Sequence, residues 1–213
     1  MSTEKEAPAD GAFDFHPDYD PAQLRRRLQG TEFMLVSRML RVARPPGAWT
    51  GPFVVGLHRE LFGQLFPTQS GRPRTGEINF GRRAGEAPER LDSLLKQLST
   101  ELQADLLEAR AIKHEGRLLE FVFLAAARSH AEMIRIHPFI DGNGRWARIT
   151  TTVFLRDAGL ICGTIVEPAE KKLYIEAIDR AIDEHEPGDL ANIFARGFVL
   201  QANRRRSGHR PVG

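Results

Sequence analysis

The chain has 213 residues, of which 41% are hydrophobic and 27% charged, and its formal net charge is +2. This length suits one domain with short extensions and a sizeable core, and the composition is unlike that of disordered or fibrous proteins. The near balance of charges excludes the global basic field that nucleic-acid-binding proteins use, so we expect no nucleic-acid partner.

The N-terminal residues and the single cysteine indicate the compartment. Residues 1–20 (MSTEKEAPADGAFDFHPDYD) are acidic and polar and contain no apolar core of the signal-peptide type. No later segment approaches the length of about eighteen uninterrupted apolar residues that indicates a membrane span. Cys162 is alone, which excludes an internal disulfide and a cysteine-based zinc site. We therefore expect a cytoplasmic protein with no membrane partner and a flexible segment at 1–20.

The first predicted element is an amphipathic helix over residues 21–43. Asp20 can cap its N-terminus, Pro21 suits the first helical position, and the prolines at 45 and 46 end it. With its connector it forms a predicted N-terminal unit at 21–52. Its apolar residues recur at steps of three and four, as on one face of a helix: Leu24, Leu28, Leu35, Met39 and Val42.

A second helix is predicted over 53–65, and the segment after it breaks the helical pattern. Residues 66–81 (FPTQSGRPRTGEINFG) contain proline, glycine and serine, and the run from Arg74 to Phe80 can be extended. We therefore predict a hairpin or flap in this segment.

The rest of the chain returns to the helical pattern. Apolar residues at helical spacing predict helices over 88–111, 118–136, 144–158, 168–185 and 188–203. The stretch 118–136 is apolar over much of its circumference, which predicts a central helix packed on several sides. The arginines at 204–206 belong to a basic tail, residues 201–213, that we expect to be solvated. The sum is an all-α domain with one small β flap.

The stretch after the central helix, residues 137–148 (HPFIDGNGRWAR), concentrates groups that can bind phosphate. The Gly-Asn-Gly turn at 142–144 permits positive φ angles, so consecutive N–H groups can converge on an anion. The helix that follows adds the positive end of its dipole, and Arg145 and Arg148 stand on its first turns as fixed charges. The pattern predicts a phosphate site.

Two other side chains in this stretch can carry out chemistry. Asp141, beside a bound polyphosphate, is placed to hold a divalent cation, since Mg²⁺ typically takes one or two carboxylates plus phosphate oxygens. His137, on the other side of the loop, can take a proton from an incoming hydroxyl as a neutral imidazole. Together with the phosphate site they describe phosphoryl or nucleotidyl transfer. The remaining candidates lack metal-ligand spacing, so we expect structural roles for His58, His114, His130, His185 and Glu132.

The stretch resembles the Fic motif, in which a histidine, a phenylalanine, an acidic residue, Gly-Asn-Gly-Arg and a final arginine occupy fixed positions. Every fixed position is matched, by His137, Phe139, Asp141, Gly142, Asn143, Gly144, Arg145 and Arg148. The order of the helices and the flap also resemble a Fic core. The resemblance implies a Fic-type helical bundle with a small β-hairpin flap, whose core domain runs from 53 to 200.

The resemblance implies transfer of AMP from ATP to a serine, threonine or tyrosine hydroxyl of a target protein, with Mg²⁺ as cofactor and pyrophosphate as product. By carry-over, His137 is the base and Asp141 holds the metal ion at the α and β phosphates. Asn143 and the backbones of Gly142 and Gly144 cradle the phosphates. Arg145 and Arg148 hold the β and γ end, and Phe139 points into the core.

The resemblance also gives the flap a role, because in this family an extended target segment docks on it by main-chain pairing. The docking residues are then Thr75, Gly76, Glu77 and Ile78. Many relatives carry an inhibitory helix with Ser or Thr, three residues, Glu, then Gly or Asn, and this pattern is not found here. We therefore expect that a separate antitoxin protein supplies the inhibitory glutamate, or that expression or oligomerisation controls the enzyme.

Two other functions remain open alternatives. One is a kinase of the Doc type or another transferase of a phosphate-containing group on the same fold, in which the nucleotide binds reversed. Gly144 argues against it, because such relatives typically have lysine or a similar residue there. The other is a non-enzymatic interaction module, which the intact set of base, carboxylate and arginines disfavours.

Overall fold

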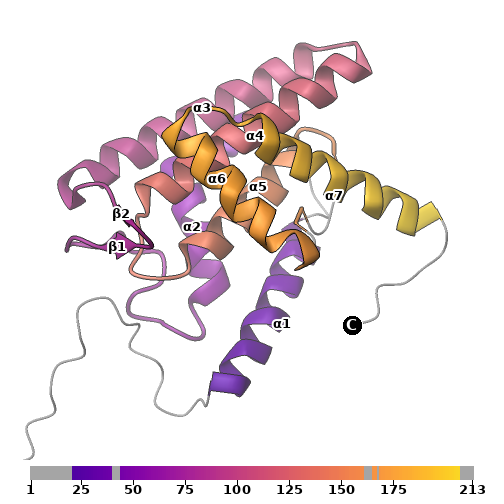
Figure 1. Cartoon of the computed structure of the whole chain (residues 1–213). Coiled ribbons are helices and arrows are strands. Elements are labelled where there is room, and N and C mark those ends of the chain that lie inside the picture. Colours follow the sequence, from indigo (N-terminus) through magenta and orange to yellow (C-terminus); the bar gives the residue numbers. More distant parts are fainter. Residues whose placement is uncertain (1–20, 40–43, 161–164, 167, 207–213) are drawn as a thin grey trace, which may run out of the picture.

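The computed structural model describes residues 21–39, 44–160, 165–166 and 168–206 (Figure 1). The described part is mainly helical with one short antiparallel hairpin, so the predicted fold class is confirmed. The helices are α1 (Pro21–Met39), α2 (Gly51–Phe62), α3 (Leu91–Ala111), α4 (Glu115–Ile136), α5 (Asn143–Asp157), α6 (Lys171–Asp183) and α7 (Gly188–Arg206). The strands are β1 (Asn79–Phe80) and β2 (Arg83–Ala84), and 3-10 turns occupy Pro46–Ala48, Pro88–Arg90 and Pro168–Glu170. None of these helices has the length and hydropathy that a bilayer span requires.

Two helices begin earlier than predicted because residues not considered as caps satisfy their first amides. α2 begins at Gly51 rather than 53, since the Thr50 hydroxyl accepts a hydrogen bond from the Phe53 amide. α4 begins at Glu115 rather than 118, since the His114 ring accepts one from the Arg117 amide.

Other boundaries shift by a few residues. α2 ends at 62 rather than 65, α5 starts at 143 rather than 144, and the helices predicted from 88 and 168 open with 3-10 turns. The Asp20 cap, the segments 1–20 and 40–43, and the tail beyond 206 lie outside the described residues. The domain boundaries at 52 and 200 stay predictions.

The central position of α4 is confirmed, because it packs against α3, α5, α6 and α7. Figure 1 shows α3 and α4 side by side along the top of the molecule, with α6 and α7 crossing in front. Alanines at 125–127 and 131 are buried on α4, and such small side chains let neighbouring helices approach closely. Val122, Met133 and Ile136 on the same helix have no exposed surface. The loop that leaves the end of α4 therefore starts from a point held on several sides.

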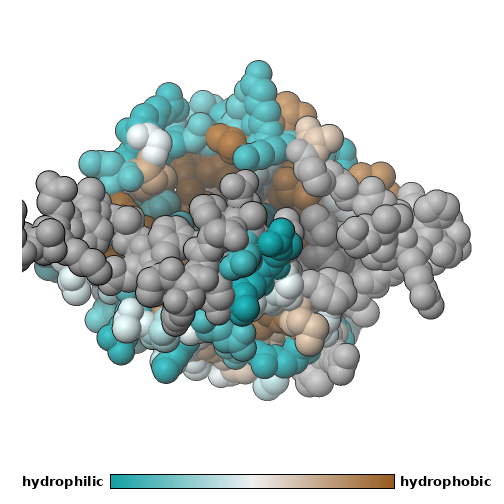
Figure 2. Space-filling model, turned by 90° about the horizontal axis from the view of Figure 1, so that it is seen from below, coloured by the Kyte–Doolittle hydropathy of each residue, from teal (hydrophilic) through white to brown (hydrophobic). Residues whose placement is uncertain are grey.

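The helices are amphipathic, and the surface reflects it. Seen from below the view of Figure 1, hydrophilic side chains prevail along the upper and lower edges of this face, and a group of hydrophobic ones lies in a hollow above its middle (Figure 2). Most large apolar side chains are buried in one continuous core that includes Trp49, Phe66, Trp146 and Phe194.

The hairpin lies later in the chain than predicted. Its strands pair Asn79 with Ala84 and Phe80 with Arg83 around a turn in which Gly81 has φ 58°. The predicted flap at 66–81 therefore holds only the first strand, and residues 74–78 are not a strand. The reason is that the Arg74 side chain is buried and bonds to carbonyl groups of neighbouring segments, which bends the chain there.

A buried histidine joins three helices behind the loop. His130 on α4 has no exposed surface; its Nδ1 lies 2.8 Å from the Thr151 hydroxyl of α5 and its Nε2 lies 2.6 Å from the Tyr174 hydroxyl of α6. Burial, aided by the charge of Arg148, lowers the pKa of His130 from 6.5 to about 3. Burial also raises the pKa of Tyr174 to about 12, so both groups are neutral at pH 7.

We predict that acid destabilises the protein through His130. Between pH 6.5 and 3 the unfolded chain binds a proton at this histidine and the folded chain does not, so stability falls as pH is lowered. At pH 5 the loss is roughly 2 kcal/mol relative to neutral pH. Urea unfolding at pH 7.5 and pH 5 measures it, with His130→Gln as a non-titrating comparison that can still bond to both hydroxyls. The variant should lose about 2 kcal/mol less than the wild type between the two pH values; an identical loss in both would contradict the prediction.

Candidate active site

The loop between α4 and α5 begins at a residue in an unusual backbone conformation. His137 caps the C-terminus of α4 in the left-handed region, with φ 50° and ψ 58°, and its amide still bonds to the Met133 carbonyl. Pro138 follows, and the steric demand of proline keeps the residue before it out of the α-helical region. The chain therefore turns sharply at His137, and the imidazole is carried on the turn rather than on the helix.

Phe139 fixes the loop to the core, as its apolar character predicts. Its ring is buried, stacks on His58 of α2 at 3.7 Å between centroids, and meets Trp146 of α5 edge to face at 5.1 Å. Trp146 in turn donates its indole N–H to the Val54 carbonyl over 2.8 Å. The loop, α2 and α5 are thus connected through one aromatic group.

The side chain of Asn143 closes the loop on itself. Its Oδ1 accepts a hydrogen bond from the Phe139 amide over 3.0 Å, and its Nδ2 donates to the Phe139 carbonyl over 2.7 Å. Asn143 is almost fully buried. With the side-chain amide bonded to the backbone of Phe139, the group that Asn143 offers to a phosphate is its backbone N–H.

His58 supports the same loop from below, which is the structural role predicted for it. Its Nδ1 accepts a hydrogen bond from the Gly71 amide over 2.9 Å, so the ring proton is on Nε2, which donates to the Asp141 carbonyl at 3.0 Å. Burial lowers the pKa of His58 from 6.5 to about 4, partly offset by the bond to Asp141. The neutral ring matches this arrangement, because a protonated Nδ1 would lose the bond from Gly71.

The ring of His137 is held in one tautomer. Its Nδ1 lies 3.1 Å from the Ile134 carbonyl, which can only accept, so Nδ1 carries the proton and Nε2 keeps its lone pair. Phe80 of β1 stacks on the ring at 3.9 Å, with the two planes 8° apart. Burial, with a smaller contribution from the charge of Arg74, lowers the pKa of His137 from 6.5 to about 4, against the opposing effect of the bond to Ile134. At neutral pH the imidazole is therefore an uncharged acceptor.

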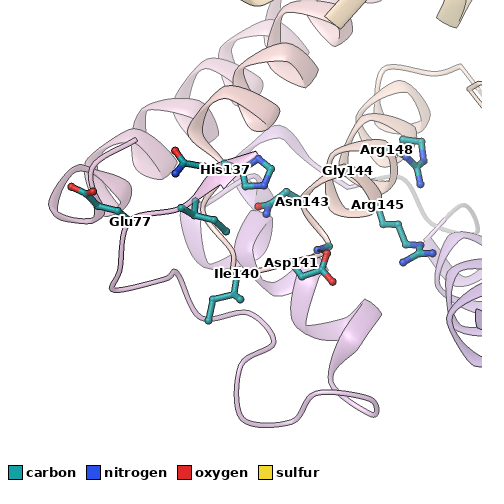
Figure 3. A pocket seen from close by; sticks show the side chains of 11 residues that line it. Glu77, His137, Ile140, Asp141, Asn143, Gly144, Arg145 and Arg148 are labelled. Atoms are coloured by element: carbon teal, nitrogen blue, oxygen red, sulfur yellow. Dashed lines mark hydrogen bonds between the residues drawn. The ribbon is translucent and has the colours of Figure 1, made fainter. Parts of the chain in front are cut away.

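A pocket of about 730 Å³ brings most of the predicted site residues together. Figure 3 shows His137 and Glu77 toward one end, Arg145 and Arg148 on α5 toward the other, and Asp141 between them. Thr75 and Gly76 are not part of its lining. The lining residues are Glu77, Ile78, Asn79, His137, Ile140, Asp141, Gly142, Asn143, Gly144, Arg145 and Arg148.

The α5 end of the pocket is built to attract anions. The first intrahelical bond joins the Trp146 amide to the Gly142 carbonyl, so the three amides before Trp146 have no partner within the helix. These amides, at 143–145, carry the positive end of the helix dipole. Among the described residues, no carboxylate pairs with Arg145 or Arg148. Two guanidinium groups and a helix N-terminus therefore offer positive charge to one ligand.

Asp141 is the one pocket carboxylate next to this positive region. It is exposed, and one of its oxygens accepts a hydrogen bond from the Gly142 amide, which orients the group. In the part of the chain that the structure describes, no cluster of three or more His, Cys, Asp or Glu side chains forms a preformed metal site. This donor set fits Mg²⁺, which commonly binds one or two carboxylates and takes its other ligands from phosphates and water.

Sequence reasoning missed two residues beside His137. Phe80 stacks on its ring and Arg74 bonds to its carbonyl group. Both belong to the run predicted to be extended, but no motif or spacing marked either of them. Their proximity to His137 depends on how the flap folds back over the loop.

We predict opposite effects of alanine at two neighbouring glycines. Gly142 has φ 78°, and a Cβ there would lie 2.4 Å from the Phe62 ring, so Gly142→Ala should destabilise the fold by roughly 2–5 kcal/mol. A Cβ at Gly144 meets nothing closer than 3.8 Å, so Gly144→Ala, inside α5, should be neutral or add up to about 1 kcal/mol. Thermal unfolding of both variants tests this pair; equal destabilisation would show that the loop does not have this conformation.

Sequence comparison identifies a matching family model and related proteins. The model of the Fic/DOC family matches residues 50–155. The protein adenylyltransferase Fic of Nematostella vectensis is 30% identical over 128 residues, and protein adenylyltransferase fic-1 of Caenorhabditis elegans is 30% identical over 106 residues. These matches cover 60% and 50% of this chain but only 27% and 19% of the relatives, so the chain spans a small part of their length.

Solved structures with the same fold extend the similarity over most of the chain. The N-terminal Fic domain of a VirB-translocated effector from Bartonella quintana has a TM-score of 0.66 at 18% identity, covering 93% of this chain and 96% of that one. A VirB-translocated effector from Bartonella tribocorum with bound AMPPNP has a TM-score of 0.62 at 20% identity, covering 84% and 87%. The fold, the motif and the matched family model agree: the chain belongs to the Fic/DOC family.

Proposed function

We propose that the protein is a Mg²⁺-dependent protein adenylyltransferase, which transfers AMP from ATP to a serine, threonine or tyrosine hydroxyl of a target protein. The observation that carries the proposal is that one pocket holds both a neutral His137 with a free Nε2 and the positive N-terminus of α5. The names of the relatives from Nematostella and Caenorhabditis support it, as do the AMPPNP and ADP bound to two of the similar structures.

The phosphates of ATP bind at the α5 end of the pocket. The amides at 143–145 donate hydrogen bonds to phosphate oxygens, and Arg145 and Arg148 neutralise the charge of the β and γ phosphates. Gly144 presents no side chain toward the ligand, and Gly142 permits the left-handed turn from which the helix amides point at the phosphates. A phosphate chain held at this end places the α-phosphorus toward His137.

His137 acts on the target and not on the nucleotide. Its Nε2 accepts the proton of the target hydroxyl while the hydroxyl oxygen forms a bond to the α-phosphorus. The bond between that phosphorus and the oxygen bridging to the β-phosphate breaks, and pyrophosphate leaves with the electron pair. The products are a phosphodiester between AMP and the target, pyrophosphate, and an imidazolium that releases its proton to solvent.

Asp141 is the residue that would hold the magnesium ion. Bound there, Mg²⁺ neutralises negative charge that builds up on the phosphates during transfer. Asp141 is suited to this because the Gly142 amide orients its carboxylate and the His58 ring holds its backbone carbonyl. Asp141 thus contributes a fixed carboxylate next to the phosphate site.

The hairpin provides the edge on which a target segment docks. Within the described residues β1 pairs only with β2, so its other edge can pair with an extended chain. Glu77 and Ile78 line the pocket beside His137 and contact the residues that flank the modified hydroxyl. Thr75 and Gly76 precede them and extend the docking segment away from the pocket.

The control of this activity is inferred from the inhibitory-helix pattern, which is not found in the sequence. We propose that a separate protein, an antitoxin, brings a carboxylate to Arg148, or that the oligomeric state of the protein limits access to the site. The location that we propose is the cytoplasm.

The position of the label in ATP distinguishes this function from its alternatives. With Mg²⁺ and a cell lysate, the purified chain should transfer radioactivity from ATP labelled at the α phosphate and none from ATP labelled at the γ phosphate. The reverse pattern would assign a kinase in which the nucleotide binds reversed, and no transfer from either label would leave an interaction module. EDTA should abolish the α-label signal, since the chelator removes the cation that would neutralise negative charge on the phosphates.

Replacing His137 should stop transfer without stopping ATP binding. Asparagine is the suitable replacement, because it tolerates the left-handed backbone that His137 adopts. A general base commonly contributes about 10² to 10⁴ in rate, so His137→Asn should lose transfer by that factor while its affinity for Mg²⁺-ATP stays within about twofold. The control is His114→Asn, an exposed histidine whose capping role asparagine can fill. Near wild-type transfer by His137→Asn would exclude His137 as the base.

A further inference from the structure

Arg74 is a buried arginine bonded to carbonyl groups. Its side chain is 5% exposed, and among the described residues it has no carboxylate within ion-pair distance. Its Nε donates to the His137 carbonyl over 2.9 Å, its Nη1 donates to the Gly76 carbonyl over 2.7 Å, and its Nη2 donates to the Glu86 carbonyl. Such burial is costly for a cation, and it lowers the pKa of Arg74, while Glu77 and Glu86 oppose this. The free-energy cost of burying this guanidinium group indicates that Arg74 has a specific role.

The three carbonyl groups belong to three different segments. Gly76 precedes β1, Glu86 follows β2, and His137 begins the loop of the active site. The backbone repeats the connection, because the Arg74 amide bonds to the Pro138 carbonyl over 2.8 Å and the Glu86 amide bonds to the Ile136 carbonyl over 3.4 Å. One guanidinium group therefore ties both ends of the hairpin to the residue that carries the imidazole.

The hairpin needs such a connection because it is too small to be stable alone. Its strands have two residues each, and an isolated two-stranded hairpin is at best marginally stable in water. On the far side, Arg83 of β2 forms ion pairs with Asp179 and Asp183 of α6. These ion pairs hold the hairpin to α6, and Phe80 of β1 stacks on the His137 ring, but neither contact fixes the two ends of the hairpin.

We infer that Arg74 is the positioning residue that sets the docking edge of β1 at a fixed place relative to the Nε2 atom of His137. The inference rests on the proposed function, since it concerns how the target hydroxyl meets the base. Only arginine suits this position, because its planar fork donates in several directions at once, whereas lysine is a single point charge. Arg74 is not among the residues that line the pocket, so it acts through the position of those that do.

Gly85 shows how closely the guanidinium group is enclosed. A Cβ at this position would lie 2.6 Å from Nη2 of Arg74 and 2.9 Å from Cγ2 of Ile78. Any side chain there would displace the guanidinium group or the pocket residue Ile78. Gly85→Ala thus disturbs the same connection while leaving the arginine and its charge in the protein.

The test compares Arg74→Gln with Arg72→Gln, an identical change at an exposed arginine two positions earlier. In the full chain we would measure amide exchange at Gly85 and Glu86, the affinity for Mg²⁺-ATP, and AMP incorporation into lysate proteins from ATP labelled at the α phosphate. Arg74→Gln should accelerate exchange at these amides by about tenfold or more and reduce incorporation by roughly 10- to 100-fold. Nucleotide affinity should stay within about twofold, because the α5 end of the pocket is untouched.

Two further variants keep the inference testable if Arg74→Gln does not fold. Gly85→Ala should give the same pattern of fast exchange, weak incorporation and normal nucleotide affinity. Arg74→Lys should not restore incorporation, although it restores the charge. The inference is overturned if Arg74→Gln or Gly85→Ala keeps wild-type exchange and incorporation, or if nucleotide affinity falls in parallel with incorporation. If the wild-type chain incorporates no label, the proposed function fails, and the exchange data still decide whether Arg74 holds the hairpin.

Discussion

The site depends on the packing of one side chain, Phe139, because this ring fixes the short loop between α4 and α5 to the core. It stacks on His58, meets Trp146, and has its backbone held at both polar groups by the amide of Asn143. Through these contacts the core determines where the loop turns, and so where Asp141 and the α5 amides point. Loss of the ring would release the Asp141 carboxylate and the anion site together, because the loop that carries Asp141 and leads into α5 is anchored to the core through this ring.

The sequence was sufficient for the parts of the molecule that local rules control. The period of apolar residues predicted the helices, and the surroundings of Pro138 predicted where α4 ends, since proline acts on its immediate neighbour. The central place of α4 followed from its apolar circumference. The stretch 137–148 predicted which side chains meet in the pocket, because residues this close in sequence, between two helix ends, have little freedom to separate.

The predictions that failed concern residues whose contacts are with residues distant in the sequence. Arg74 and Phe80 reach His137 only when the flap folds over the loop, across more than fifty residues of chain. The predicted extended run was interrupted for the same reason, since a buried guanidinium group bonded to its neighbours outweighs the weak preference for a strand. The caps at Thr50 and His114 were missed because the helix starts were placed from the apolar pattern, to which capping residues do not belong.

The electrostatics of the pocket serve two requirements at once. A phosphate site needs positive charge, and a general base needs a free lone pair, which nearby positive charge preserves, whereas a nearby carboxylate would raise the pKa of the imidazole. Here burial disfavours the imidazolium, and the charge of Arg74, fixed beside His137, acts in the same direction to a smaller extent, so the pKa of His137 falls to about 4. The Ile134 carbonyl takes the place of a carboxylate in orienting the ring. The base thus stays neutral next to an anion site, at the cost of being a weak base, and its contribution must come from position rather than from proton affinity.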